Sequence, residues 1–236
     1  MSNSLFLPYI CDKPIEESEL KLLSPYDIDI LSNYNDSFGE HIKPKQIITM
    51  LWRSWAWKSF AMKSVMEKFR YKFMYNLTDR NMRGYEKVGW SDYFHVSTEV
   101  FRIISQEKFI SWRVPEWKNK NYYWLLWPTA DKNIIALTPA WIETLRKYCV
   151  DNNIAFDSIF IHASSDVCEK RMIERWDDEK DIKDRLEHDE KVFSEEKCKE
   201  CSDYSINSDI PKDQFEFEIR KTIMQIQNRV LNVLNS

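Results

Sequence analysis

The segment that decides the fold runs from residue 47 to residue 59 and reads Ile-Ile-Thr-Met-Leu-Trp-Arg-Ser-Trp-Ala-Trp-Lys-Ser. Its first five residues form a short apolar run, which is typical of a buried strand. Beyond residue 59, the apolar residues recur at helical spacing, as Met62, Val65, Met66 and Phe69. The segment therefore predicts a strand, a loop and a helix in direct succession.

The rest of the chain continues this alternation. Further strands are expected at 72–75, 134–137 and 158–162, and helices at 97–105, 140–149, 166–175 and from residue 211 onward, where Ile219, Ile223, Ile226, Val230 and Leu234 form one stripe. Strands that alternate with helices are typical of βαβ units, so the sequence predicts an α/β fold with a mainly parallel sheet flanked by helices. The first 44 residues lack long periodic elements and are interrupted by Pro8, Pro14, Pro25 and Pro44. We expect residues 1–44 to be an N-terminal extension of unknown role and residues 45–236 to be the main domain.

Composition and charge exclude several classes of protein. No apolar run approaches the roughly 18 residues of a membrane span, and the start lacks a secretion signal, so we expect a cytoplasmic protein without a membrane partner. The chain has 34 basic and 38 acidic side chains and a net charge of −4, which gives no indication of a nucleic-acid partner. Five cysteines, with one isolated Cys198-x-x-Cys201 pair, favour free thiols over a zinc site. Nothing in the sequence indicates an oligomeric state.

The loop after the first predicted strand partly matches a nucleotide-binding P-loop, G-x-x-x-x-G-K-[ST]. Lys58 and Ser59 match the motif, but Trp52 and Trp57 occupy both glycine positions. A P-loop curls its backbone N–H groups around a phosphate, which requires unusual φ angles and no side chain in the space of the anion. As written, the loop is expected to repack rather than to hold a phosphate.

Several motifs that follow in order give this loop its context. Residues 76–89 read Asn-Leu-Thr-Asp-Arg-Asn-Met-Arg-Gly-Tyr-Glu-Lys-Val-Gly, and residues 91–97 read Ser-Asp-Tyr-Phe-His-Val-Ser. Next come Asn121-Tyr122-Tyr123, then Arg171, Arg175 and Arg185, and finally Asp203-Tyr204-Ser205-Ile206-Asn207. This order resembles the guanylate kinase family, with its patterns T-T-R-x-x-R-x-x-E-x-x-G-x-D-Y-x-F-V, N-Y-Y-G and R-L-x-x-R-G…R-L. The resemblance covers about residues 45–236 and implies a P-loop kinase fold with an inserted NMP-binding region and a lid.

The resemblance also implies an activity, the Mg²⁺-dependent transfer of the ATP γ-phosphoryl group to a nucleoside or deoxynucleoside monophosphate. ATP would be bound by Trp52, Arg53, Ser54, Trp55, Ala56, Trp57, Lys58 and Ser59, with Mg²⁺ on Ser59. The monophosphate would be bound by Asn76, Arg80, Arg83, Tyr93 and Tyr123. The catalytic cations would be Lys58, Arg171, Arg175 and Arg185.

The positions for base recognition depart from the family. Residues that contact guanine in the family are replaced by Ser111, Leu125, Ala136 and Thr138. These replacements argue against GMP as the acceptor, because unmatched polar edges of a base are costly to bury. Asn76 can still read the edge of a base, so the base and the sugar of the acceptor are both left open.

Tryptophan repeatedly stands where the family has glycine. The chain contains 3 glycines and 10 tryptophans, whereas glycine normally accounts for about 7% of residues. Besides the P-loop, the family's glycine positions include those of Trp124, Trp141 and Trp176. We therefore hypothesise that the gene uses a codon, UGA first among the candidates, that its source reads as glycine.

The rival hypothesis is a genuine tryptophan-rich relative without catalysis. Such a chain would be a kinase-fold binding module that holds an anionic or phosphorylated partner in the former acceptor cleft. Lys58 discriminates between the two hypotheses, because only the enzyme needs this cation to bind ATP.

Overall fold

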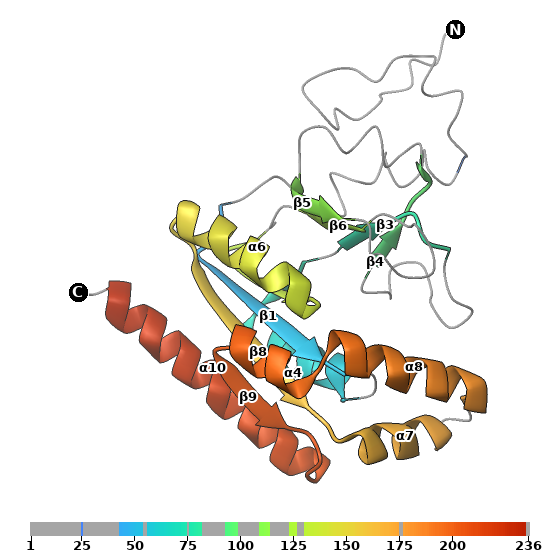
Figure 1. Cartoon of the computed structure of the whole chain (residues 1–236). Helices are drawn as coiled ribbons and strands as arrows, with labels where there is room; N and C mark the ends of the chain where they lie inside the picture. Colours follow the sequence, from blue (N-terminus) through green and yellow to red (C-terminus); the bar gives the residue numbers. More distant parts are fainter. Residues whose placement is uncertain are drawn as a thin grey trace, which may run out of the picture. The chain divides into compact units, whose positions relative to one another are not determined.

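The structure is a computed structural model that describes residues 25, 43–53, 56–74, 76–81, 93–98, 109–113, 123–126, 130–174 and 177–234. The chain divides into two compact units (Figure 1). One unit comprises residues 44–73 and 130–236, and the other comprises residues 1–43 and 74–129. Residues 74–129 thus interrupt the larger unit in sequence, as an inserted region does. Apart from residues 25, 43 and 44, the predicted extension lies outside the described residues.

The larger unit is built on a five-stranded sheet whose order is β2-β7-β1-β8-β9. The central strand β1 (Gln46–Trp52) lies between β7 (Lys132–Ala136) and β8 (Ala155–His162), and the edges are β2 (Lys72–Phe73) and β9 (Tyr204–Asn207). All the pairs in this sheet are parallel. The predicted α/β fold with a mainly parallel sheet is therefore confirmed, although β2 is shorter than the predicted strand.

Helices cover both faces of this sheet, with α4 (Lys58–Phe69) and α10 (Lys212–Leu234) on one face and α6 (Pro139–Asp151) and α9 (Glu195–Cys201) on the other (Figure 1). The two remaining helices, α7 (Ser165–Ile173) and α8 (Glu179–Val192), pack against each other. The buried stripe of α10, which includes Ile219, Ile223 and Ile226, packs with α4 in one apolar cluster that also holds Ile48 and Ile134 from the sheet. Burying each such side chain contributes roughly 1.5–3 kcal/mol, so this cluster holds α4 at the end of β1.

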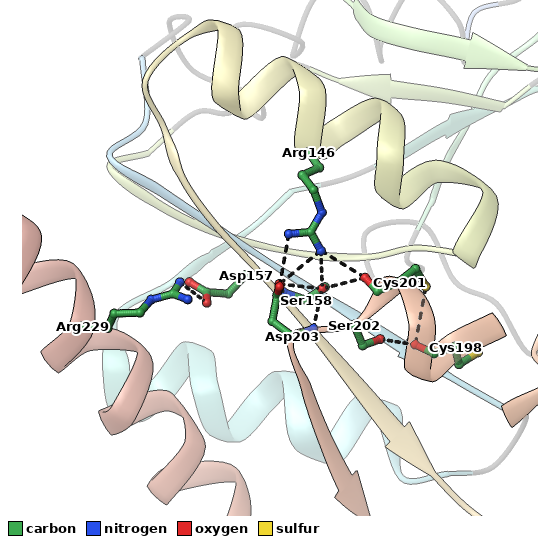
Figure 2. A network of polar contacts seen from close by, with 8 residues as sticks. All are labelled: Arg146, Asp157, Ser158, Cys198, Cys201, Ser202, Asp203 and Arg229. Carbon is green, nitrogen blue, oxygen red and sulfur yellow. Dashed lines mark hydrogen bonds and ion pairs between the residues drawn. The ribbon is translucent and has the colours of Figure 1, made fainter. Parts of the chain in front are cut away.

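A polar network ties the sheet to α6 and fixes the start of β9 (Figure 2). The Ser158 N–H and hydroxyl each donate to Asp203 Oδ2 at 2.8 Å. Arg146 of α6 donates to the Ser158 hydroxyl at 3.1 Å and pairs with Asp203 at 3.2 Å. These bonds bring the short strand β9 alongside β8.

The neighbouring residue Asp157 points to the opposite face of β8, where Arg229 of α10 pairs with it (Figure 2). The Asp157 side chain is 0% exposed, and its Oδ2 atom has no hydrogen-bond partner among the described residues. Burial raises the pKa of Asp157 from 3.8 to about 6, although the charge of Arg229 lowers it. Asp157 is therefore a carboxylate whose charged form the fold disfavours.

The smaller unit contains a four-stranded sheet whose order is β4-β3-β6-β5. Its strands are β3 (Asn76–Thr78), β4 (Tyr93–His95), β5 (Phe109–Arg113) and β6 (Tyr123–Leu126). β3 pairs with β4 in parallel, whereas β6 pairs with β3 and with β5 in antiparallel orientation. The strand list predicted from the sequence did not include this sheet. The predicted helix at 97–105 lies outside the described residues except for positions 97 and 98.

The raised pKa of Asp157 predicts a pH dependence of stability. Between pH 3.8 and about 6 the folded protein binds the Asp157 proton more tightly than the unfolded chain does. This stabilising contribution is complete below the lower value and is lost as the pH rises through 6, by up to about 3 kcal/mol. Asparagine does not titrate, so the Asp157→Asn variant does not lose this stability as the pH rises. In urea denaturation its free energy of unfolding, relative to the unsubstituted chain, should therefore rise from pH 4.5 to pH 7.5.

Asp131→Asn is the matched control for this experiment, because Asp131 is an exposed carboxylate paired with Lys45. Its free energy of unfolding relative to the unsubstituted chain should stay within about 0.5 kcal/mol over the same pH range. A pH-independent difference for Asp157→Asn would contradict the interpretation.

Candidate functional site

The loop between β1 and α4 has the backbone conformation of a glycine at residue 57. Trp57 is the N-cap of α4 and has φ 56° and ψ 31°, in the left-handed region. The Ala56 N–H donates to the Arg53 carbonyl at 3.3 Å, which closes the turn before this residue. A non-glycine residue in this region costs roughly 1–2 kcal/mol. Position 57, the second glycine of the P-loop motif, therefore has a conformation that favours glycine.

The indole rings of two P-loop tryptophans lie against two of the cations that the resemblance assigns to catalysis. Lys58 Nζ is 4.9 Å from the ring centre of Trp52, and Arg171 Cζ is 4.2 Å from that of Trp57. The Trp57 ring also packs edge-on against Phe215, with 5.5 Å between ring centres. Such cation–π contacts contribute about 0.5–2 kcal/mol each. As written, the loop does not fit a triphosphate, because indoles take the place next to both cations.

The other residues predicted for ATP and Mg²⁺ lie on or beside the same loop. Ala56 is fully buried, whereas Ser59 is exposed in the first turn of α4. A hydroxyl in this position is a suitable oxygen ligand for Mg²⁺ when phosphate oxygens complete the coordination. Ser54 and Trp55 lie outside the described residues.

The three arginines predicted to be catalytic, which the resemblance places in the lid, have different surroundings. Arg171 of α7 donates to the Ser208 carbonyl at 2.6 Å, and burial lowers the pKa of its guanidinium. Arg185 of α8 pairs with Asp177 at 3.4 Å. Arg175 lies outside the described residues. Of the described lid arginines, Arg171 is thus the one in contact with the loop.

Arg53 turns away from solvent toward the helices. It is 7% exposed and forms an ion pair with Glu190 of α8. Its charge lowers the pKa of the buried thiols of Cys168 in α7 and Cys198 in α9, although burial raises both pKa values more strongly. The Arg53 side chain therefore joins the loop to the helices that follow β8.

In the smaller unit, strand register places three of the predicted acceptor residues in two cross-strand rows that are separated by one other row. One row contains Tyr93, Asn76, Leu125 and Ser111, and the next row but one contains His95, Thr78, Tyr123 and Arg113. The first row therefore brings together three positions, 76, 111 and 125, to which the resemblance assigns contacts with the base. The sequence could not predict this strand register, because the register depends on pairing between strands that are far apart in the chain.

Aromatic contacts link three of the residues predicted to bind the monophosphate. The rings of Tyr93 and Tyr123 meet edge-on with 5.6 Å between their centres, and Arg80 Cζ lies 5.6 Å from the Tyr93 ring centre. Asn76 is buried at 6% exposure. Arg83 lies outside the described residues. The structure thus brings together Arg80, Tyr93 and Tyr123, with Asn76 in the cross-strand row of Tyr93.

Sequence reasoning missed His95, which is buried in the same unit. Its Nδ1 atom is 2.8 Å from the Arg80 carbonyl oxygen, and its ring centre is 6.3 Å from that of Tyr93. The available signal was a departure from the pattern D-Y-x-F-V, in which position 95 is phenylalanine. A polar residue at a buried position of a motif indicates a specific hydrogen bond.

The described cysteines are free thiols, and Cys198 is fully buried. Burial raises the pKa of Cys198 to about 12, so its thiol is protonated at neutral pH. Within the described ranges, no group of three histidine, cysteine or acidic residues could hold a metal ion.

No protein-family model matches the chain, and no curated protein matches it in sequence. Among solved structures, the chain is similar to guanylate kinase from Anaplasma phagocytophilum, with 17% sequence identity and a TM-score of 0.52. The match covers 79% of this chain and 86% of that chain. The fold is therefore guanylate kinase-like. In the part of the chain that the structure describes, no helix is long and apolar enough to span a membrane.

The Arg53–Glu190 ion pair predicts a selective loss of stability. Glu190→Gln leaves the buried Arg53 guanidinium without its carboxylate, so the free energy of unfolding should fall by about 1.5 kcal/mol in urea denaturation at pH 7. Glu187→Gln, at another exposed position of α8, is the matched control and should change it by less than about 0.5 kcal/mol. Equal effects of the two substitutions would show that the pair contributes nothing.

Proposed function

We propose that the chain is a nucleoside monophosphate kinase that transfers the γ-phosphoryl group of ATP to a nucleoside or deoxynucleoside monophosphate with Mg²⁺. The observation that carries the proposal is the left-handed backbone at residue 57, directly between a central parallel strand and the helix that begins with Lys58. A strand, a loop and a helix that begins with Lys-Ser are the structural context in which a P-loop occurs. The guanylate kinase-like fold supports the same function.

The proposal includes glycine at positions 52, 55 and 57 of the native protein, from a codon that its source reads as glycine. Removing the indoles of Trp52 and Trp57 would leave Lys58 and Arg171 facing the space that these rings fill. The backbone N–H groups of the loop and these two cations could then hold the donor phosphates. Ser59 would hold Mg²⁺, which neutralises phosphate charge when bound.

The positions differ in how strongly they favour glycine. Trp57 has a left-handed backbone, which favours glycine. Trp141 is the buried third residue of α6, and a right-handed helical backbone does not favour glycine. The structural support for glycine is therefore confined to residue 57, and for the other tryptophans the hypothesis rests on the motif and on composition.

The arrangement around Arg80 supports a monophosphate as the acceptor. A planar guanidinium can bind two phosphate oxygens at once, and the neighbouring phenols of Tyr93 and Tyr123 can donate further hydrogen bonds. The acceptor phosphate is itself the anionic nucleophile, so the reaction needs position and charge neutralisation more than a general base.

One observation favours a second candidate, an inactive binding module for an anionic or phosphorylated partner. In the chain as written, indoles occupy the donor loop while the acceptor residues keep their contacts. Such a module would bind its partner through the smaller unit and would not bind ATP.

Restoring the loop should restore activity. We expect a chain with Trp52→Gly, Trp55→Gly and Trp57→Gly to release ADP with at least one common monophosphate, because the loop N–H groups then reach the donor phosphates. The chain as written should show no turnover in the same coupled assay. Absence of ADP release with all the monophosphates in the restored chain would refute the kinase proposal.

Lys58 separates the two candidate functions. In the restored chain, Lys58→Met should lower kcat by on the order of 10²-fold or more, because it removes a preorganised charge from the transferred phosphoryl group. Lys63→Met, an exposed lysine of the same helix, is the control and should leave kcat unchanged. Undiminished turnover of Lys58→Met would contradict the assigned role.

A further inference from the structure

The backbone of Arg80 is fixed at both of its polar groups. Its N–H donates to the Thr78 hydroxyl at 3.2 Å, and its carbonyl oxygen is 2.8 Å from His95 Nδ1. Arg80 lies just beyond the end of β3, so these side-chain bonds take the place of sheet bonds at this residue. They determine where the Arg80 side chain leaves the main chain.

The side chain of Arg80 is also held. Its Nη1 atom donates to the Asn81 carbonyl at 2.9 Å, and its guanidinium carbon is 5.6 Å from the Tyr93 ring centre. Both the main chain and the side chain of this arginine therefore have defined partners. Recognition groups need such support, because a displacement of about 0.5 Å already weakens a bidentate contact.

The partner of His95 determines which nitrogen of the imidazole ring carries the proton. A carbonyl oxygen only accepts, so His95 Nδ1 must carry the proton, whether the ring is neutral or charged. His95 is 8% exposed and lies opposite Thr78 in the strand register. The ring therefore donates from a buried, fixed position to Arg80, the second residue beyond the end of the neighbouring strand β3.

We propose that His95 is a positioning residue for phosphate recognition, acting through the hydrogen bond from its Nδ1–H to the carbonyl of Arg80. The inference rests on the proposed function, because it takes Arg80 to bind the acceptor phosphate. It goes further by assigning a role to a residue that replaces the phenylalanine of the D-Y-x-F-V pattern. His95 does not itself touch the acceptor in this role.

Two isosteric substitutions test the role of the Nδ1 atom. Asparagine places its amide nitrogen near the position of Nδ1, whereas glutamine places it near that of Nε2. In the chain with glycine at 52, 55 and 57, His95→Asn should bind monophosphates within about threefold of the parent. His95→Gln should bind them about tenfold more weakly, as expected for the loss of one hydrogen bond. The probes are AMP, GMP, CMP and UMP, measured by calorimetry.

Further readouts separate positioning from a general loss of structure. The dissociation constant for ATP and the thermal midpoint should be similar in His95→Asn and His95→Gln. Equal weakening by both variants, or a loss of monophosphate affinity matched by a loss of ATP affinity, would overturn the positioning role. If the parent binds none of the four monophosphates, the proposed function itself fails.

The tautomer gives a test that needs no ligand. Nitrogen NMR of the unliganded protein at pH 7.5 should show the His95 proton on Nδ1. The chain contains four histidines, so its ring signals can be assigned by substitution. A proton found only on Nε2 would overturn the inference, whatever the activity of the protein.

Discussion

The left-handed backbone of residue 57 is the constraint on which the rest of the structure depends. Strand β1 is the centre of the parallel sheet, and the helix that follows it, α4, is packed with α10 in the core. Both elements are held by burial, so the chain between them must turn within a few residues. A left-handed residue directly before Lys58 completes this turn. Such a conformation can direct successive backbone N–H groups toward an anion, and it disfavours a residue with a bulky side chain.

The two units divide the chemistry between them. In the larger unit, Lys58 and Arg171 lie against the indoles of the loop, and Arg53 is committed to Glu190. In the smaller unit, Arg80 is held by Thr78, Asn81 and Tyr93, and the proposed function assigns it to the acceptor phosphate. The fold is guanylate kinase-like, and under the proposed function the tryptophans of the loop are what separates the chain as written from a P-loop that binds phosphate.

The sequence predicted the central strands of the larger unit and the helices α4, α6, α7 and α10, because these strands are apolar runs and α10 carries a long apolar stripe. The list of elements predicted from periodicity omitted α8, α9 and β9, which are short or strongly charged. It missed the sheet of the smaller unit, since strands of three residues such as β3 give little periodicity. The burial of Arg53 could not be predicted from the sequence either, because its partner Glu190 is 137 residues away along the chain. Motif order predicted Arg80, Tyr93 and Tyr123 as acceptor residues, and the structure places them in contact with one another. His95 lies at a position where the motif has phenylalanine.

The identity of the loop residues in the native protein tests the central claim most directly. Trypsin cleaves after Arg53 and Lys58, so one short peptide contains positions 54–58. Mass spectrometric sequencing of this peptide, from protein isolated from its source, should find glycine at positions 55 and 57. Tryptophan at both positions would contradict the account and would leave a kinase fold without a phosphate loop.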